Sequence, residues 1–182
     1  MRQKIDMWKL SAQLVFRAPE AHLVERARRS LRLIASALPP RIWFAVFKTL
    51  WNGWVTERRF GNRTSSCPFC DNPYGEESLI HFSHCTTTRT LFANCLAIPY
   101  EQYLPIYFWG LYDTQLCMGR KLAAAVCTFV IYKHFLSFKH SHCTKLGRSC
   151  LPKSLTRMFW TTVEDIRCRS KSLIRNLHTF SA

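Results

Sequence analysis

Apolar residues recur at helical spacing along most of the chain, and this pattern predicts a mainly α-helical fold. Residues 21–38 place an apolar side chain every three or four positions, with arginines on the other side. Pro39 and Pro40 end this helix and begin another over about residues 41–56, whose apolar side chains cover most of the helix surface. We therefore expect the second helix to be central to the core, its aromatic residues serving packing rather than base stacking.

Further helices are predicted around a segment that is rich in cysteine and histidine. Glu76 and Glu77 suit the first turn of a short helix, because the helix dipole favours negative charge there. An aromatic stretch over residues 103–112 is interrupted by proline and glycine and is expected to cover the core. The remaining helices are predicted over residues 86–96, about 115–138 and about 155–177. The chain is divided into an N-terminal extension (1–20), a helix pair (21–64), the segment rich in cysteine and histidine (65–98) and a C-terminal helical region (99–182).

The chain carries a formal net charge of +15, and its distribution matters more than the total. Residues 1–64 have a net charge of +9 and residues 119–182 one of +10, whereas residues 65–118 have −4. A strongly basic protein is suited to a polyanion, so RNA or DNA is the expected partner, engaged through its phosphates. The candidate phosphate-binding residues are Arg26, Arg28, Arg29, Arg32, Arg58, Arg59 and Arg63.

Cysteine usage and hydropathy indicate the compartment. The nine cysteines are odd in number, irregularly spaced outside one cluster, and not preceded by a secretory signal. A reducing compartment, nuclear or cytoplasmic, is therefore expected. No uninterrupted apolar run reaches the length of about 18 residues that a membrane span needs, so we expect no membrane partner.

One cluster of residue types and spacings predicts a specific chemistry. Cys67 and Cys70 are separated by two residues, a spacing typical of a turn that directs two sulfurs to one point. His81 and Cys85 are one helical turn apart. His84 is the alternative to Cys85, since it shares a helical face with His81; we prefer Cys85 because a thiolate binds zinc strongly. The expected ligands of one structural Zn²⁺ ion are therefore Cys67, Cys70, His81 and Cys85. The fold class is thus a small helical domain with a Cys3His zinc knuckle inserted between helices.

Other groups of polar residues lack such spacing. No adjacent aspartate pair occurs in the chain, and the few carboxylates of the C-terminal region have no spacing that would gather a magnesium ion. We therefore expect no polymerase or nuclease centre and no enzymatic activity. A second histidine and cysteine group matches no regular metal-binding pattern and is interpreted as polar loop residues: His140, His142, Cys143 and Cys150.

The residues around the zinc-binding cluster resemble a known family. Residues 50–60 contain an Asn-Gly-Trp and an Arg-Arg-Phe sequence before the Cys-x2-Cys pair, and residues 76–85 lead from two glutamates into His-x3-Cys. This arrangement is similar to the zinc-binding region downstream of the reverse transcriptase in non-LTR (LINE-type) retrotransposons, over about residues 38–140. The resemblance implies a module that helps the element's protein engage its RNA template or target DNA, with the rest of the reverse transcriptase as a further partner.

Two functions follow from these observations. The first is a non-catalytic, zinc-stabilised nucleic-acid-binding domain of a retroelement reverse transcriptase polyprotein, whose basic helices contact phosphates. The alternative is a zinc-stabilised protein-interaction module that presents the aromatic stretch over residues 103–112 to a partner. In both, an ion with four protein ligands has no open position for a substrate, so its role is structural.

Overall fold

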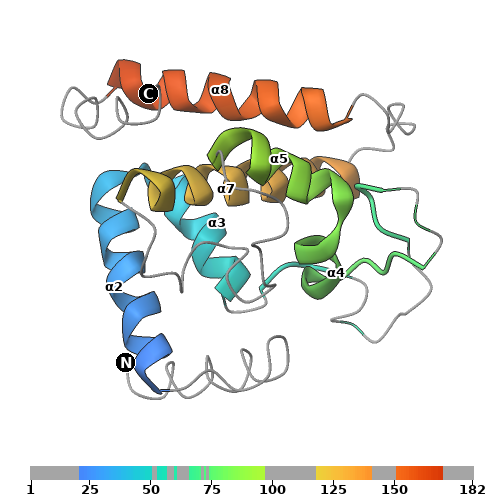
Figure 1. Cartoon of the computed structure of the whole chain (residues 1–182), viewed down its shortest axis with the longest axis horizontal. Coiled ribbons are helices and arrows are strands. Elements are labelled where there is room, and N and C mark those ends of the chain that lie inside the picture. Colours follow the sequence, from blue (N-terminus) through green and yellow to red (C-terminus); the bar gives the residue numbers. More distant parts are fainter. Residues whose placement is uncertain are drawn as a thin grey trace.

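The computed structural model describes residues 21–50, 53–56, 60, 66–70, 72, 74–96, 118–140 and 151–169, and confirms a mainly helical fold (Figure 1). These residues form no strand, although Ser66 and Glu76 make an isolated antiparallel bridge. One hydrophobic core includes residues of every described helix. The helices are α2 (Ala21–Ala37), α3 (Pro40–Leu50), α4 (Leu79–His84), α5 (Thr86–Leu96), α7 (Met118–His140) and α8 (Leu151–Arg169).

Helix α7 is the centre of the fold. Residues 122–128 are all buried, and so are Val130, Ile131 and Phe135, so the helix is covered around most of its circumference. α3, α5 and α8 pack along it, and Figure 1 shows α8 running alongside α5 and α7. By length and composition α7 could cross a membrane, but 61% of its most apolar window is buried within the protein. The central position accounts for its apolar character.

The corner between α2 and α3 follows the predicted proline break. α2 ends at Ala37, and Pro40 is the first residue of α3. The Ile42 N–H donates to the Pro39 carbonyl at 2.9 Å, which closes the first turn of α3. Ile34 and Ile42 are both buried, so the two amphipathic helices direct their apolar faces into the same core.

The prediction that the second helix continues to about residue 56 was wrong, since α3 ends at Leu50 and residues 53–56 are not helical. The Gly53 N–H donates to the Lys48 carbonyl at 2.6 Å, so the chain turns back on the end of the helix. Trp54 then enters the core, where its indole N–H donates to Thr49 at 2.9 Å. Trp54 continues the apolar spacing of the helix although it lies beyond the helix end. The spacing alone therefore predicted a helix that was too long.

An aromatic cluster joins α7 to the segment that carries the cysteines. The Trp54 ring centroid lies 5.0 Å from that of Tyr132 and 5.3 Å from that of Phe135, both on α7. It also lies 5.8 Å from Phe82 of α4, and Phe82 packs edge-on against Phe69 at 5.0 Å. Such aromatic pairs add specific geometry to burial. The cysteine-containing segment is therefore part of the main core.

The other predicted helices lie close to their expected positions. α5 coincides with the predicted helix over residues 86–96, and α7 is displaced slightly towards the C-terminus. α8 starts earlier than predicted, because Pro152 is accommodated in its first turn. Outside the described residues lie the N-terminal extension (1–20), the aromatic stretch (103–112) and residues 170–177.

Candidate metal centre

Four side chains converge beside α4, and their ligand atoms all lie within 4.8 Å of one another: Cys67, Cys70, His81 and Cys85. Cys67 Sγ is 4.0 Å from Cys85 Sγ. Cys70 Sγ is 3.3 Å from His81 Nε2. A tetrahedral metal ion bound at about 2.3 Å from sulfur separates two sulfurs by about 3.8 Å, so these spacings fit a single ion at the centre. The structure thus brings together the four residues that the spacing predicts.

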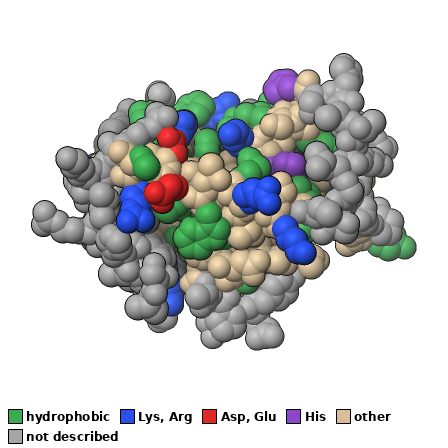
Figure 2. All heavy atoms as spheres, turned by 90° about the horizontal axis from the view of Figure 1, so that it is seen from above, with side chains coloured by type: hydrophobic (Ala, Val, Ile, Leu, Met, Phe, Trp, Pro, Cys, Tyr) green, Lys and Arg blue, Asp and Glu red, His purple; other side chains and the backbone are tan. Residues whose placement is uncertain are grey.

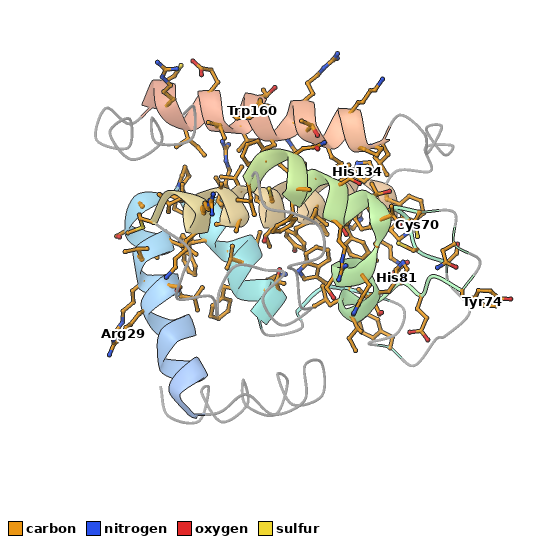
Figure 3. All side chains as sticks on the ribbon, in the orientation of Figure 1. Arg29, Cys70, Tyr74, His81, His134 and Trp160 are labelled. Carbon is orange, nitrogen blue, oxygen red and sulfur yellow. The ribbon has the colours of Figure 1, made fainter. Side chains whose placement is uncertain are left out.

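The first two ligands lie in a tight loop, called here the cysteine loop (described residues 66–70, 72 and 74–77). The Phe69 N–H donates to Cys67 Sγ at 3.4 Å, and the Cys67 N–H donates to the Gly75 carbonyl at 2.6 Å. The bridge between Ser66 and Glu76 closes the base of the loop. Backbone N–H groups that donate to a thiolate orient it and offset its charge. Figure 3 shows Cys70 and His81 at this end of the molecule, with Tyr74 pointing outward.

The third and fourth ligands are placed by α4. Ser78 is its N-cap, and the Ser78 hydroxyl accepts a hydrogen bond from the His81 N–H at 3.1 Å. At the other end, the Cys85 N–H donates to the His81 carbonyl at 2.7 Å. Residues four apart on a helix lie above one another, so His81 and Cys85 face the same cysteine loop. One short capped helix therefore sets the geometry of half of the cluster.

Cys85 also stands immediately before α5, which begins at Thr86. The hydrogen bond from Cys67, together with the backbone amides of Thr87 and Thr88, holds the pKa of Cys85 well below its ordinary value of 9.0, although burial opposes this shift. The same hydrogen bond, with burial, raises the pKa of Cys67. A helix N-terminus stabilises a thiolate because unpaired N–H groups point at it. Cys85 is therefore placed to act as an anionic ligand.

Two threonines that the sequence analysis did not single out hold this junction together. Thr87 Oγ1 donates to the Phe69 carbonyl at 2.7 Å, which ties α5 to the cysteine loop. Thr88 Oγ1 donates to the Cys85 carbonyl at 2.9 Å and to the Phe82 carbonyl. Both threonines are buried. The run of three threonines directly after Cys85 could have identified them in the sequence, because threonine is favoured at the start of a helix.

Gly75 and Glu77 fix the loop from outside the cluster. A Cβ atom at Gly75 would lie 3.0 Å from His81 Nε2 and 3.0 Å from the Asn72 carbonyl oxygen, so glycine allows the close approach of the ring.

Glu77 is 3% exposed, and its Oε1 lies 2.9 Å from Nζ of Lys139 on α7. The expectation that the two glutamates occupy the first turn of a helix was wrong, because both precede α4. Glu77 instead anchors the cysteine loop to α7.

His84, the alternative fourth ligand, lies outside the cluster. Its side chain is exposed, and its Nδ1 is 2.9 Å from the Ile80 carbonyl oxygen and 3.3 Å from Ser83 Oγ. His84 and Cys85 are adjacent residues, so they point in different directions around the helix end. The structure therefore places Cys85 in the cluster and His84 against its own helix.

Two of the seven predicted phosphate-binding arginines have side chains that the structure describes. Arg29 and Arg32 are exposed on α2. Figure 3 shows Arg29 pointing outward near the opposite end of the long axis from Cys70 and His81. The side chains that the structure does not describe are those of Arg26, Arg28, Arg58, Arg59 and Arg63.

The other polar groups form no second centre within the described residues. His140 is exposed at the end of α7, and its three candidate neighbours lie outside the described residues. The two carboxylates of α8 face cations: Asp165 pairs with Arg41, and Glu164 lies 3.8 Å from Arg167. These contacts are ordinary ion pairs at the protein surface.

No family model matches the chain, and comparisons with curated proteins and with solved structures find no match either. The resemblance to the retrotransposon family therefore remains a prediction from the sequence motif. The geometry itself establishes a Cys3His group suited to a metal ion, set into a helical core. Because four protein donors complete a tetrahedron, such an ion would have no open position for a substrate.

Proposed function

We propose that this protein is a non-catalytic, zinc-stabilised nucleic-acid-binding domain, of the kind that follows the reverse transcriptase in LINE-type retroelements and helps engage RNA template or target DNA. The observation that carries the proposal is a closed Cys3His cluster together with exposed basic side chains on α2, α3, α7 and α8 that are not among its four ligands. The cluster supports a structural ion, and the basic helices support a polyanionic partner. The two roles are assigned to different parts of the molecule.

Zinc is the proposed ion because of the donor set. Three thiolates and one imidazole in a tetrahedral arrangement are typical ligands of structural zinc. Calcium and magnesium require oxygen donors, and the cluster contains none. Because an unfolded chain does not hold the four donors together, zinc binding would contribute directly to folding.

Exposed cations occur on α2, α3, α7 and α8. Glu77, Asp165 and Glu164 each face a cation, and the chain's 26 lysines and arginines outnumber its 11 aspartates and glutamates. Figure 2 shows Lys and Arg side chains spread over the face that α8 covers, beside a small acidic patch. Such side chains bind phosphates and release the counterions around them. The exposed basic residues are Arg29, Arg32, Arg41, Arg120, Lys133, Lys153, Arg157 and Arg167.

Salt-dependent binding tests the proposal. The zinc-loaded chain is titrated into fluorescein-labelled RNA and DNA oligonucleotides at salt concentrations from about 50 to about 300 mM, and the logarithm of affinity should fall linearly with the logarithm of salt concentration. Replacing Arg29 and Arg32 by glutamate should weaken binding, whereas replacing both by lysine should preserve it. Absent binding at low salt, or a flat salt dependence, would contradict the proposal and favour the protein-interaction alternative.

A further inference from the structure

A groove of about 510 Å³ between α3 and α7 belongs neither to the metal cluster nor to the closed core. Its apolar lining includes Phe44 of α3 with Phe129 and Tyr132 of α7. Phe44 is 45% exposed, so its ring lies at the surface beside the groove. The volume is within the range of pockets that bind small molecules or single chemical groups.

The rim of the groove carries positive charge from Arg41 and Lys133. His140 also lines it, and its lining includes no carboxylate. Arg41 Cζ lies 5.9 Å from the Phe129 ring centroid, and Lys48 Nζ lies 5.2 Å from that of Phe44. Asp165 pairs with Arg41, whereas Lys48 and Lys133 form no ion pair with another described residue. An apolar, aromatic lining beside positive charge complements a ligand that combines an aromatic ring with an anion.

We propose that the groove receives an unstacked base of a single-stranded nucleic acid, with the base against Phe44 and the adjoining phosphates near Lys48 and Lys133. The inference rests on the proposed nucleic-acid binding and narrows it to single strands. Bases stack on protein aromatic rings irrespective of sequence, while basic side chains follow the backbone. A duplex keeps its bases stacked inside the helix and presents no base face to a ring.

The test compares matched aromatic variants of the zinc-loaded chain. Phe44→Ala removes the ring in the groove, Phe44→Tyr keeps a ring there, and Trp160→Ala removes a similarly exposed ring, 49% exposed, from α8. Affinities are measured by fluorescence anisotropy for a single-stranded oligonucleotide, the matching duplex, and a strand of the same length with abasic sites. We expect Phe44→Ala to weaken single-strand binding by roughly fivefold or more. Phe44→Ala should bind the duplex and the abasic strand as tightly as the wild type does. Phe44→Tyr and Trp160→Ala should bind all three oligonucleotides with wild-type affinity.

The outcomes separate this inference from the proposed function. If the wild-type chain binds none of the three oligonucleotides at low salt, the proposed function fails. If it binds them, two results would overturn the base-binding groove and leave phosphate binding intact. One is that Phe44→Ala and Trp160→Ala have the same affinities; the other is that Phe44→Ala weakens binding to the abasic strand as much as binding to the normal strand. Binding of an acidic amphipathic peptide to the groove without oligonucleotide binding would also overturn it. Circular dichroism and zinc content of each variant show that the fold is retained.

Discussion

The carboxylate of Glu77 lies 2.9 Å from the ammonium group of Lys139, and this contact joins the cysteine loop to the last turn of α7. Glu77 is almost fully buried, whereas Lys139 is partly exposed. Removing one member of a buried ion pair leaves the other charge in a poorly solvated place. The pair therefore connects the stability of the whole fold to the position of the metal-binding loop.

We predict that Lys139→Met lowers the free energy of unfolding of the zinc-loaded protein by about 3 kcal/mol, because it takes away a cation that faces the buried carboxylate of Glu77. The double variant with Glu77→Gln should recover part of this loss, since the buried charge is then gone. Lys133→Met, an exposed lysine on the same helix, is the matched control and should change little. Urea denaturation measures all three, and equal stabilities of the single and double variants would contradict the buried-pair interpretation.

The metal ligands can be tested by metal analysis. Cys70→Ser should reduce zinc from one ion per chain to nearly none and should lower the melting temperature, because metal binding is coupled to folding. Cys168 is an exposed cysteine on α8, so Cys168→Ser should keep the full zinc content. His84→Ala should keep it as well, since His84 lies against the Ile80 carbonyl. Loss of zinc from the His84 variant would instead identify His84 as a ligand.

Gly75 provides a prediction that depends on space alone. In Gly75→Ala the new methyl group would lie 3.0 Å from the His81 ring, so the imidazole must move from its position in the cluster. We expect zinc affinity to fall by roughly tenfold, the size of effect seen when the support of a ligand is disturbed. Gly53→Ala serves as the control. Its new Cβ atom would lie 3.2 Å from the Lys48 carbonyl oxygen, and neither residue is adjacent to a ligand in the sequence. It should reduce stability but not zinc affinity in a chelator competition assay.

A pH dependence is expected from His134. Burial lowers the pKa of His134 below its ordinary value of 6.5, so the unfolded chain takes up a proton more readily than the folded one. The contribution of neutral His134 to stability is therefore complete above about pH 6.5 and is lost as the pH falls through the lower, folded-state pKa.

Phe is the informative substitution at His134, because the ring already packs at 5.8 Å from Phe69. The loss of unfolding free energy between about pH 7.5 and about pH 5.5 should be smaller in His134→Phe than in the wild type. Exposed His140→Phe should show the wild-type loss. Denaturation of zinc-loaded samples at both values measures the difference, and equal losses in all three proteins would exclude a role for His134.

The sequence predicts the helices and the four clustered residues well because both depend on local spacing. Apolar periodicity locates α5 and α7, and Cys-x2-Cys with His-x3-Cys describes the cluster without reference to the rest of the chain. Helix ends and supporting contacts depend on residues far apart in the sequence. Glu77 faces Lys139, and Trp54 enters the core against Tyr132, so periodicity alone could not place either residue.

Phe69 stands between two of the candidate ligands and also packs against Phe82 in the interior. The loop that would hold the ion therefore supplies a side chain that the core needs. Loss of the ion would loosen both together and expose aromatic surface to proteases and chaperones. Cellular zinc supply would then set how long each folded copy of the protein survives.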